Sequence, residues 1–400
     1  MQHKEIHRKK LMEAIALRCA ESPVTVLLGA RQVGKTTLAR MFTQGRDDVT
    51  WYDLETSAGM EALRAMPEKA LGGKRGLVVL DEIQRMPELF RILRPLCDRE
   101  GAPARFLLLG SSSPDLIRGV SESLAGRAQF LPVPGLTVEE VGKENQDRLW
   151  IRGGLPLAYL ARDNAMARRW HEGFVQTFLE RDIPQMGLRV AATALRRFWS
   201  MAAHFHGQIL NLTELARALG VSPGAARHHL DILCGSFVMR QLQPWHENLG
   251  KRQVKSPKLY FRDSGLLHFF LGTDGLDGLL THPRLGASWE GFALEQVLAQ
   301  VGDRDAYFWA TQRGAELDLL ILRQGRRYGF EFKASDAPRL TPSMRIALED
   351  LKLDRLWVLH PGSAAPYALQ ERIEVCPLRE WTPGLFPVSS VAAARGPSDS

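Results

Sequence analysis

The sequence predicts an α/β protein: a parallel β-sheet covered by helices, then a helical segment, a helix-turn-helix module and a smaller α/β domain. Three observations carry this prediction. Residues 24–38 read as a buried strand, a glycine-rich loop and the first turn of a helix. Residues 76–85 contain an apolar run that ends at two carboxylates. Residues 314–336 read as two strands joined by a hairpin, far along the chain from the first sheet.

Composition is that of an ordinary globular protein. The chain has 400 residues, of which 45% are hydrophobic and 24% charged, which suits about two to four domains. Its apolar runs are shorter than the ~20 residues that cross a bilayer, and the charged first residues lack the apolar core of a secretion signal. We therefore expect no membrane partner. The cysteines (Cys19, Cys97, Cys234 and Cys376) lack C-x-x-C spacing, which argues against zinc and disulfides and suits a cytoplasmic protein. The net charge of +7 permits a nucleic-acid partner without requiring one.

The glycine-rich loop has the spacing G-x-x-x-x-G-K-[ST] at Gly29, Gly34, Lys35 and Thr36. Two glycines let the backbone curl so that successive N–H groups face phosphate oxygens, and the following helix adds its positive end. We therefore expect ATP here, with Lys35 reaching the β- and γ-phosphates and Thr36 holding Mg²⁺. The residues predicted to bind the nucleotide in this loop are Gly29, Ala30, Arg31, Gln32, Val33, Gly34, Lys35, Thr36 and Thr37.

Helices and strands alternate around this loop. We expect a helix over 5–20, a strand over 50–54, a helix over 58–70 and a buried strand that ends at Asp81. An unbroken apolar strand is typical of a parallel sheet with both faces covered, and its carboxyl end lies where ligands bind. This resembles the Walker B element, so Asp81 is predicted to act on the Mg²⁺ shell and Glu82 to polarise the attacking water.

The next strand, residues 105–113, ends in serines. These resemble the sensor-1 position of AAA+ ATPases, where Ser111 or Ser112 would contact the γ-phosphate; the alternative is a serine-rich turn that caps the next helix. Arg127 precedes the last strand and occupies the place of an arginine finger, which acts on the nucleotide of a neighbouring copy and would make the protein a homo-oligomer. The alternative is a surface or salt-bridged arginine.

The order of these motifs resembles one group of prokaryotic AAA-type ATPases that carries a C-terminal domain of unknown function. Short sequence motifs similar to those of the group occur at 149–156 (LWIRGGLP), 178–184 (FLERDIP) and 255–267 (KSPKLYFRDSGLL). The resemblance therefore covers about residues 5–385. It implies an ATPase core over 1–136 and a helical lid over 137–195. Gly154 and Pro156 resemble the G-x-P of signalling-type P-loop ATPases, which implies that Pro156 lies in a turn near the nucleotide base; the alternative is an ordinary turn.

The sequence of residues 196–262 predicts a winged-helix module. The stretch 212–233 reads helix, turn, helix, with Gly220 as a left-handed turn residue and Ser222 as the cap of the second helix. Such a module can contact DNA or serve only as a packing module, and the pattern leaves both open. The basic stretch 250–258 is the better candidate for phosphate contacts.

Residues 263–386 resemble the PD-(D/E)xK nuclease core. In the second strand of the hairpin, Glu331 and Lys333 share a face, and Asp318 lies on the partner strand. Glu290 is on a preceding helix. Carboxylates beside a lysine can hold a divalent cation and activate water, so Glu290, Asp318 and Glu331 are predicted metal ligands and Lys333 a predicted catalytic residue. The alternatives are a solvated Glu–Lys pair or a nuclease fold without metal chemistry.

These motifs leave three functional hypotheses. The first is an ATPase that couples its nucleotide state to a DNA-directed, nuclease-like module. The second is an ATP-controlled switch whose C-terminal domain binds a partner without cutting nucleic acid. The third is a regulator that binds ATP but scarcely hydrolyses it. Residues 387–400 are expected to form a disordered tail.

Overall fold

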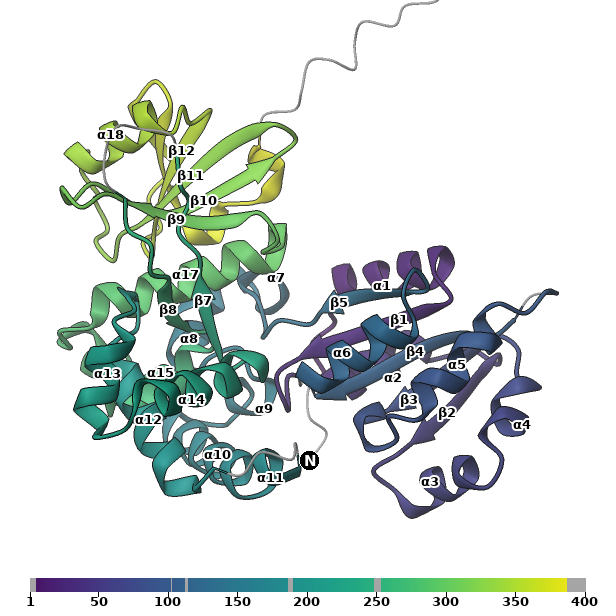
Figure 1. Cartoon of the computed structure of the whole chain (residues 1–400). Helices are drawn as coiled ribbons and strands as arrows, with labels where there is room; N and C mark the ends of the chain where they lie inside the picture. The colour runs from purple at the N-terminus through teal and green to yellow at the C-terminus, as the bar shows by residue number, and fades with distance from the viewer. Residues whose placement is uncertain (1–4, 102, 112–113, 186–189, 248–252, 387–400) are drawn as a thin grey trace, which may run out of the picture. The chain divides into compact units, whose positions relative to one another are not determined.

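The computed structural model describes residues 5–101, 103–111, 114–185, 190–247 and 253–386 (Figure 1). The chain divides into two compact units. The first contains residues 1–242 and 256–292, and the second contains residues 243–255 and 293–400. The boundary differs from the one expected at residue 263, because residues 263–292 belong to the first unit. The tail at 387–400 and Ser112 lie outside the described residues.

The first unit contains the predicted parallel sheet. Its five strands have the order β2-β3-β4-β1-β5 and pair in parallel. They are β1 (Val24–Gly29), β2 (Val49–Asp53), β3 (Leu77–Asp81), β4 (Arg105–Ser111) and β5 (Ala128–Pro132). Val26 packs into one buried cluster and Leu27 into another, as expected for a sheet buried on both faces.

One helix precedes these strands and others connect them. They are α1 (Lys9–Glu21), α2 (Lys35–Thr43), α3 (Ser57–Arg64), α4 (Pro67–Gly72), the 3₁₀ turn η1 (Ile83–Arg85), α5 (Leu89–Cys97) and α6 (Pro114–Ser123). The single helix predicted over 58–70 is two helices. Pro67 starts the second one, since proline lacks the N–H that would continue the first.

The described residues between 138 and 204 are mostly helical, which agrees with the helical composition predicted for residues 137–195. The elements are α7 (Val138–Val141), η2 (Lys143–Asn145), α8 (Gln146–Arg152), α9 (Pro156–Tyr159), α10 (Asn164–Thr177), η3 (Phe178–Asp182), α11 (Ile183–Gln185) and α12 (Ala192–His204). The segment η3 is a π-helical turn between α10 and α11. Turns of this kind are rare and are found frequently at functional sites.

The predicted helix-turn-helix follows. It consists of α13 (Leu212–Leu219) and α14 (Pro223–Gly235), and a small antiparallel sheet of β6 (Gln208–Ile209), β8 (Lys258–Phe261) and β7 (Met239–Leu242) adjoins it. Gly220 has φ +68°, and the side chain of Ser222 accepts a hydrogen bond from the Ala225 N–H at 3.2 Å. Both residues therefore act as the sequence predicts.

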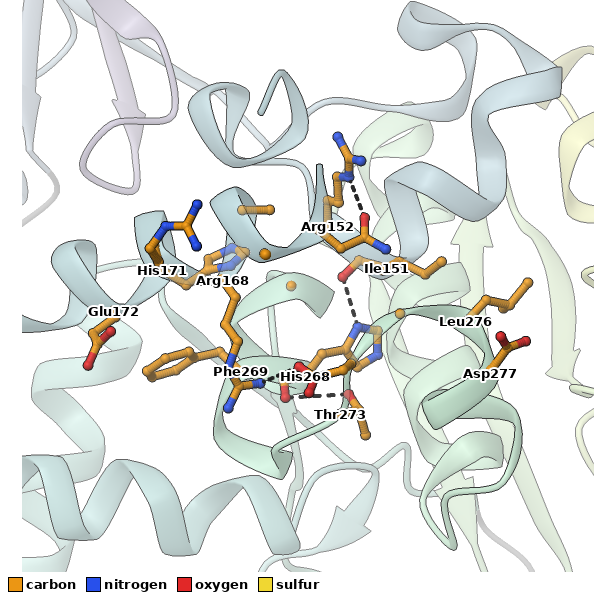
Figure 2. Close-up of a pocket in the computed structure, with 17 residues that line it drawn as sticks. Ile151, Arg152, Arg168, His171, Glu172, His268, Phe269, Thr273, Leu276 and Asp277 are labelled. Carbon is orange, nitrogen blue, oxygen red and sulfur yellow. Dashed lines mark hydrogen bonds and ion pairs between the residues drawn. The ribbon is translucent and has the colours of Figure 1, made fainter. Parts of the chain in front are cut away.

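Helices α15 (Ser264–Leu271) and α16 (Gly275–Leu280) complete this part of the first unit. Together with α8 and α10 they line a cavity of about 650 Å³ (Figure 2). Arg152 and Arg168 line it beside Asp274 and Asp277, and the buried rings of His171 and His268 also belong to its wall. Its lining contains no residue of the phosphate loop.

The second unit is built on a mixed six-stranded sheet of order β13-β14-β12-β11-β10-β9. Helix α17 (Leu285–Val301) leads into it, and its elements are β9 (Ala306–Ala310), β10 (Glu316–Arg323), β11 (Arg326–Phe332), α18 (Pro342–Asp350), β12 (Arg355–His360), β13 (Tyr367–Gln370), β14 (Ile373–Pro377), η4 (Leu378–Glu380) and η5 (Pro383–Leu385). Strands β10 and β11 form the predicted hairpin, with Gln324 and Gly325 at positive φ in its turn. Helix α18 connects β11 to the parallel strand β12.

Within the described ranges, every helix is too short or too polar to cross a membrane.

Candidate functional site

The phosphate loop connects β1 to α2, and its two motif glycines are required for different reasons. A Cβ on Gly29 would lie 2.5 Å from the carbonyl oxygen of Val133, so the backbone after β5 approaches too closely for any side chain. Gly34 has φ +93°, a conformation that costs glycine little. Pro156 at the start of α9 lies beside Gly34, since a Cβ there would be 3.5 Å from its ring. The predicted turn near the nucleotide is therefore adjacent to the loop.

Lys35 begins α2 and is buried under the loop. Its Nζ donates hydrogen bonds to the carbonyl oxygens of Gly29 and Ala30, both at 2.9 Å. Burial lowers the pKa of Lys35 to about 8, although the carboxylates of Glu82 and Asp81 favour the charged form. An ammonium held in this position suits an anionic ligand that enters the loop.

Asp81 ends β3, and its carboxylate accepts a hydrogen bond from the side chain of Thr36. Burial raises the pKa of Asp81 to about 6. The structure thus brings together the two residues predicted to hold Mg²⁺. Oxygen ligands of this kind are those that Mg²⁺ prefers, and a cation beside them would favour the ionised carboxylate.

Glu82 follows Asp81 with φ +55°, a conformation that is uncommon for residues other than glycine. The side-chain amide of Gln84 donates a hydrogen bond to the Glu82 carboxylate, so this carboxylate has a partner beside the predicted Mg²⁺ ligands. The motif analysis did not identify Gln84.

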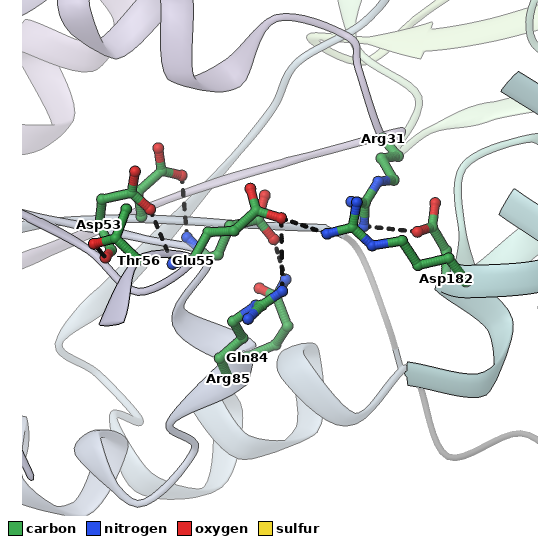
Figure 3. Close-up of polar contacts among 10 residues, drawn as sticks. Arg31, Asp53, Glu55, Thr56, Gln84, Arg85 and Asp182 are labelled. Carbon is green, nitrogen blue, oxygen red and sulfur yellow. Dashed lines mark hydrogen bonds and ion pairs between the residues drawn. The ribbon is translucent and has the colours of Figure 1, made fainter. Parts of the chain in front are cut away.

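Further charged residues border the phosphate loop and were not predicted as a group (Figure 3). Arg31, within the loop, forms an ion pair with Asp182 at the end of η3, with 2.9 Å between Arg31 Nη1 and Asp182 Oδ1. Arg181 donates a hydrogen bond to Glu55 at 2.6 Å, and Arg85 lies 3.6 Å from the same carboxylate. The only sequence signal for these contacts was the stretch FLERDIP at 178–184, which carries both Arg181 and Asp182.

Two predicted residues are placed at the ends of strands. Ser111 ends β4 and is paired in register with Gly29, so its backbone lies at the edge where the phosphate loop begins. Arg127 lies just before β5, at the opposite end of the same sheet. Its guanidinium binds both oxygens of Asp98, at 2.7 and 2.8 Å. The structure thus contains the salt-bridged arginine offered as the alternative, and a finger role toward another copy stays a prediction.

In the second unit, three of the predicted nuclease-like residues lie together. Lys333 Nζ is 2.6 Å from Glu331 Oε2 and 3.9 Å from Asp318 Oδ2. The carboxylate of Asp318 also accepts a hydrogen bond from the Phe332 N–H at 3.0 Å. Both carboxylates are buried, at 6% and 4% residue exposure for Asp318 and Glu331, while the Lys333 side chain is 37% exposed.

The fourth residue, Glu290, belongs to the first unit. Its carboxylate accepts hydrogen bonds from the Lys258 ammonium at 2.9 Å and from the Tyr260 hydroxyl at 2.5 Å. Across the described part of the chain, no group of three or more His, Cys, Asp or Glu residues is arranged to hold a metal ion. Within the second unit, Asp318 and Glu331 are the predicted carboxylates that lie together, and the part assigned to Glu290 stays a prediction.

Comparison with known proteins divides the chain into three matched regions. Residues 21–142 match an AAA domain, residues 143–277 match a domain of unknown function (DUF8612), and residues 285–381 match another (DUF4143). The uncharacterized proteins Rv2008c of Mycobacterium tuberculosis and Mb2031c of Mycobacterium bovis are each 48% identical over 357 residues. Each alignment covers 89% of this chain and 80% of the relative.

Solved structures show weaker similarity. The Walker-type ATPase of Pyrococcus abyssi is 14% identical, with a TM-score of 0.47 over 68% of this chain and 97% of that one. The ORC2 protein of Aeropyrum pernix in its ADP form is 16% identical, with a TM-score of 0.31 over 60% of this chain and 87% of that one. Membership of a family therefore rests on the mycobacterial relatives and the domain matches.

Proposed function

This chain belongs to the same family as the mycobacterial protein Rv2008c, and on that premise we propose that its AAA domain is a Mg²⁺-dependent ATPase whose nucleotide state acts on the domains that follow it. The single observation that carries the proposal is the convergence of Lys35, Thr36 and Asp81 at the carboxyl end of a parallel sheet. Ligands bind at this end of such sheets, and these three residue types serve phosphate and Mg²⁺.

Each residue has a distinct part in the proposed reaction. The loop N–H groups and the Lys35 ammonium bind the phosphates, and Thr36 and Asp81 would hold Mg²⁺, which neutralises charge on the phosphate oxygens. The Glu82 carboxylate orients the attacking water and accepts its proton, and Gln84 positions that carboxylate.

The test is nucleotide binding and hydrolysis by wild type, Lys35→Ala and Glu82→Gln. Loss of a charge-assisted phosphate contact is expected to weaken ATP binding by about tenfold or more in Lys35→Ala. Glu82→Gln should still bind ATP but lose about 100-fold or more in kcat. Lys69→Ala, which removes an exposed lysine of α4, is the matched control and should behave as wild type. Unchanged binding and turnover in Lys35→Ala would contradict the proposal.

A second candidate function concerns the C-terminal unit, where the cluster of Lys333 with the buried carboxylates Asp318 and Glu331 favours metal-dependent phosphodiester cleavage. The connectivity supports it: a helix, three antiparallel strands, then α18 and the parallel strand β12. Asp318 and Glu331 would supply oxygen ligands for a divalent cation, and Lys333 would orient or deprotonate the attacking water.

This candidate is tested by incubating supercoiled and linear DNA with the protein and Mg²⁺ or Mn²⁺, with and without ATP. Cutting that disappears in Lys333→Ala but persists in Arg345→Ala, which removes an exposed cation of α18, would support the nuclease. Loss of cutting in Lys35→Ala would show that ATP controls it. Intact DNA together with ATP turnover would favour a binding module that the ATPase regulates.

A further inference from the structure

Asp182, the last residue of the π-helical turn η3, has a buried charge that the proposed reaction does not explain. Its side chain is 1% exposed, and neither carboxylate oxygen accepts a well-oriented hydrogen bond from the residues that the structure describes. The nearby cation is Arg31 of the phosphate loop, whose side chain is 19% exposed and whose Nη1 lies 2.9 Å from Asp182 Oδ1. The contact is thus an ion pair without aligned hydrogen bonds.

Such an arrangement is costly. A buried carboxylate loses its hydration, and the loss is offset only when good hydrogen bonds or ion pairs replace the water. Burial raises the pKa of Asp182 to about 6, although Arg31 and Arg181 favour the charged form. The carboxylates of Glu82 and Glu55 raise that pKa further, so Asp182 lies within electrostatic reach of the residue proposed to orient the water.

Arg31 lies in the same electrostatic cluster as the phosphate-binding lysine. It is part of the loop between β1 and α2, and its charge lowers the pKa of Lys35. A phosphate held by Lys35 would therefore be attracted to the Arg31 guanidinium as well, and it would repel the Asp182 carboxylate. Phosphate and Asp182 compete for one cation.

We propose that Asp182 is a positioning residue that holds Arg31 in the absence of a terminal phosphate and yields it to the γ-phosphate of ATP. ADP lacks that group and leaves the ion pair in place, so the pair distinguishes the two nucleotides. The exchange frees the end of η3, and through η3 the nucleotide state reaches the helices that follow. The inference rests on the proposed ATPase function and specifies how that site is regulated.

The surface contact between Arg181 and Glu55 forms a second link between η3 and the sheet. Arg181 is adjacent to Asp182 and donates a hydrogen bond to Glu55, just after β2. At 48% and 47% side-chain exposure the pair is screened by solvent and contributes little on its own. In the proposal this exposed pair stays in place in both states, and the buried pair of Arg31 and Asp182 is the one that responds to nucleotide.

The experiment measures the affinity of a non-hydrolysable ATP analogue and of ADP, with Mg²⁺, for wild type, Asp182→Asn, Arg31→Ala and the double variant. In Asp182→Asn, which keeps the side-chain shape, the analogue should bind about fivefold more tightly, while ADP affinity changes less than about twofold. In Arg31→Ala the analogue should bind about fivefold more weakly and ADP as before. In the double variant the ratio of the two affinities should equal that of Arg31→Ala, because Asp182 acts only through Arg31.

Asp274→Asn is the matched control. It removes the acidic partner of Arg168, 3.1 Å away, from an exposed position of the same unit, and should leave both affinities unchanged. Equal changes for the analogue and ADP in Asp182→Asn would indicate a structural role and overturn the proposal. The proposal would also be overturned if Asp182→Asn changed the ratio of analogue to ADP affinity in a protein that already carries Arg31→Ala. Loss of ATP hydrolysis in Asp182→Asn with that ratio unchanged would overturn it as well. If Asp182→Asn fails to fold, Arg31→Ala is the test by itself, because an equal loss of affinity for the ATP analogue and for ADP would overturn the inference.

The two proposals fail in distinguishable ways. If wild type binds neither nucleotide, the ATPase function itself is wrong. A second outcome is that wild type binds both nucleotides and Lys35→Ala binds neither, while Asp182→Asn leaves the ratio of analogue to ADP affinity unchanged. In that case the ATPase proposal stands and only the proposed role of Asp182 is wrong.

Discussion

At the scale of single residues, the shape of the phosphate loop depends on the missing side chain of Gly29. The 2.5 Å distance from an added Cβ to the Val133 carbonyl oxygen requires the backbone of β1 or of the segment after β5 to move. Overpacking of this kind costs about 1–3 kcal/mol. The strain falls on the loop that holds Lys35, so it should affect binding as well as stability.

We therefore predict that Gly29→Ala weakens ATP binding by about tenfold or more and lowers the thermal midpoint of the first unit. Isothermal titration calorimetry and thermal unfolding measure the two effects. The control is Gly173→Ala on the exposed side of α10, where an added Cβ meets no atom within 4 Å and the helix should gain up to about 1 kcal/mol. Normal ATP binding by Gly29→Ala would show that the loop tolerates the side chain.

His171 makes stability depend on pH. Its burial, helped by His268, lowers the pKa of His171 to about 3, below the value near 6.5 of an unfolded histidine. The unfolded chain thus takes up a proton that the folded chain does not. Neutral His171 therefore contributes to the free energy of unfolding above about pH 6.5, and this contribution is lost as the pH falls toward 3.

The predicted result is that wild type loses stability relative to His171→Gln by up to about 1.4 kcal/mol per pH unit between about pH 6 and 4. Comparing the two proteins removes opposing contributions of distant groups, such as that of Asp81, whose pKa burial raises to about 6. Urea unfolding at four pH values gives the difference. A difference that stays constant with pH would contradict the folded-state pKa.

At the scale of elements, the turn between α13 and α14 is defined by local chemistry. Gly220 supplies the left-handed residue and Ser222 caps α14, while Pro223 occupies its first turn. An N-cap hydroxyl satisfies a backbone N–H that the helix leaves without a partner.

Ser222→Ala should accordingly cost about 1 kcal/mol and lower the thermal midpoint of the first unit by roughly 2 °C. Differential scanning calorimetry is the measurement. Ser121→Ala makes the same chemical change at an exposed position within α6 and should have little effect. Equal midpoints for Ser222→Ala and wild type would show that solvent caps the helix equally well.

At the scale of the whole molecule, the chain has two compact units with separate cores. A ligand that binds only the folded form of one unit stabilises that unit by mass action. The proposed nucleotide site lies entirely within the first unit, so ATP should act on that unit first.

We predict two unfolding transitions, of which ATP at about 100 times its dissociation constant stabilises one by about 2.7 kcal/mol. Scanning calorimetry of the intact chain, with and without ATP, measures the shift. Lys35→Ala should abolish the shift. Movement of both transitions together would show that the units unfold cooperatively.

Sequence alone determined the features whose physics is local. The spacing of Gly29, Gly34 and Lys35 specified a loop between strand and helix, and the apolar run before Asp81 specified a strand buried on both faces. Gly220 and Ser222 likewise marked a turn and a cap. Glycine freedom, helix capping and hydrophobic periodicity act over a few residues, and a reader of the sequence can see all of them.

Only the tertiary structure decided which distant residues meet. It paired Arg31 with Asp182, Arg127 with Asp98 and Glu290 with Lys258, and none of these pairs has a signal in sequence spacing. The meeting of two charges depends on how separate helices and strands pack, and on whether burial makes a partner necessary. Burial is a property of the folded chain, so the unexplained charge of Asp182 became visible only there.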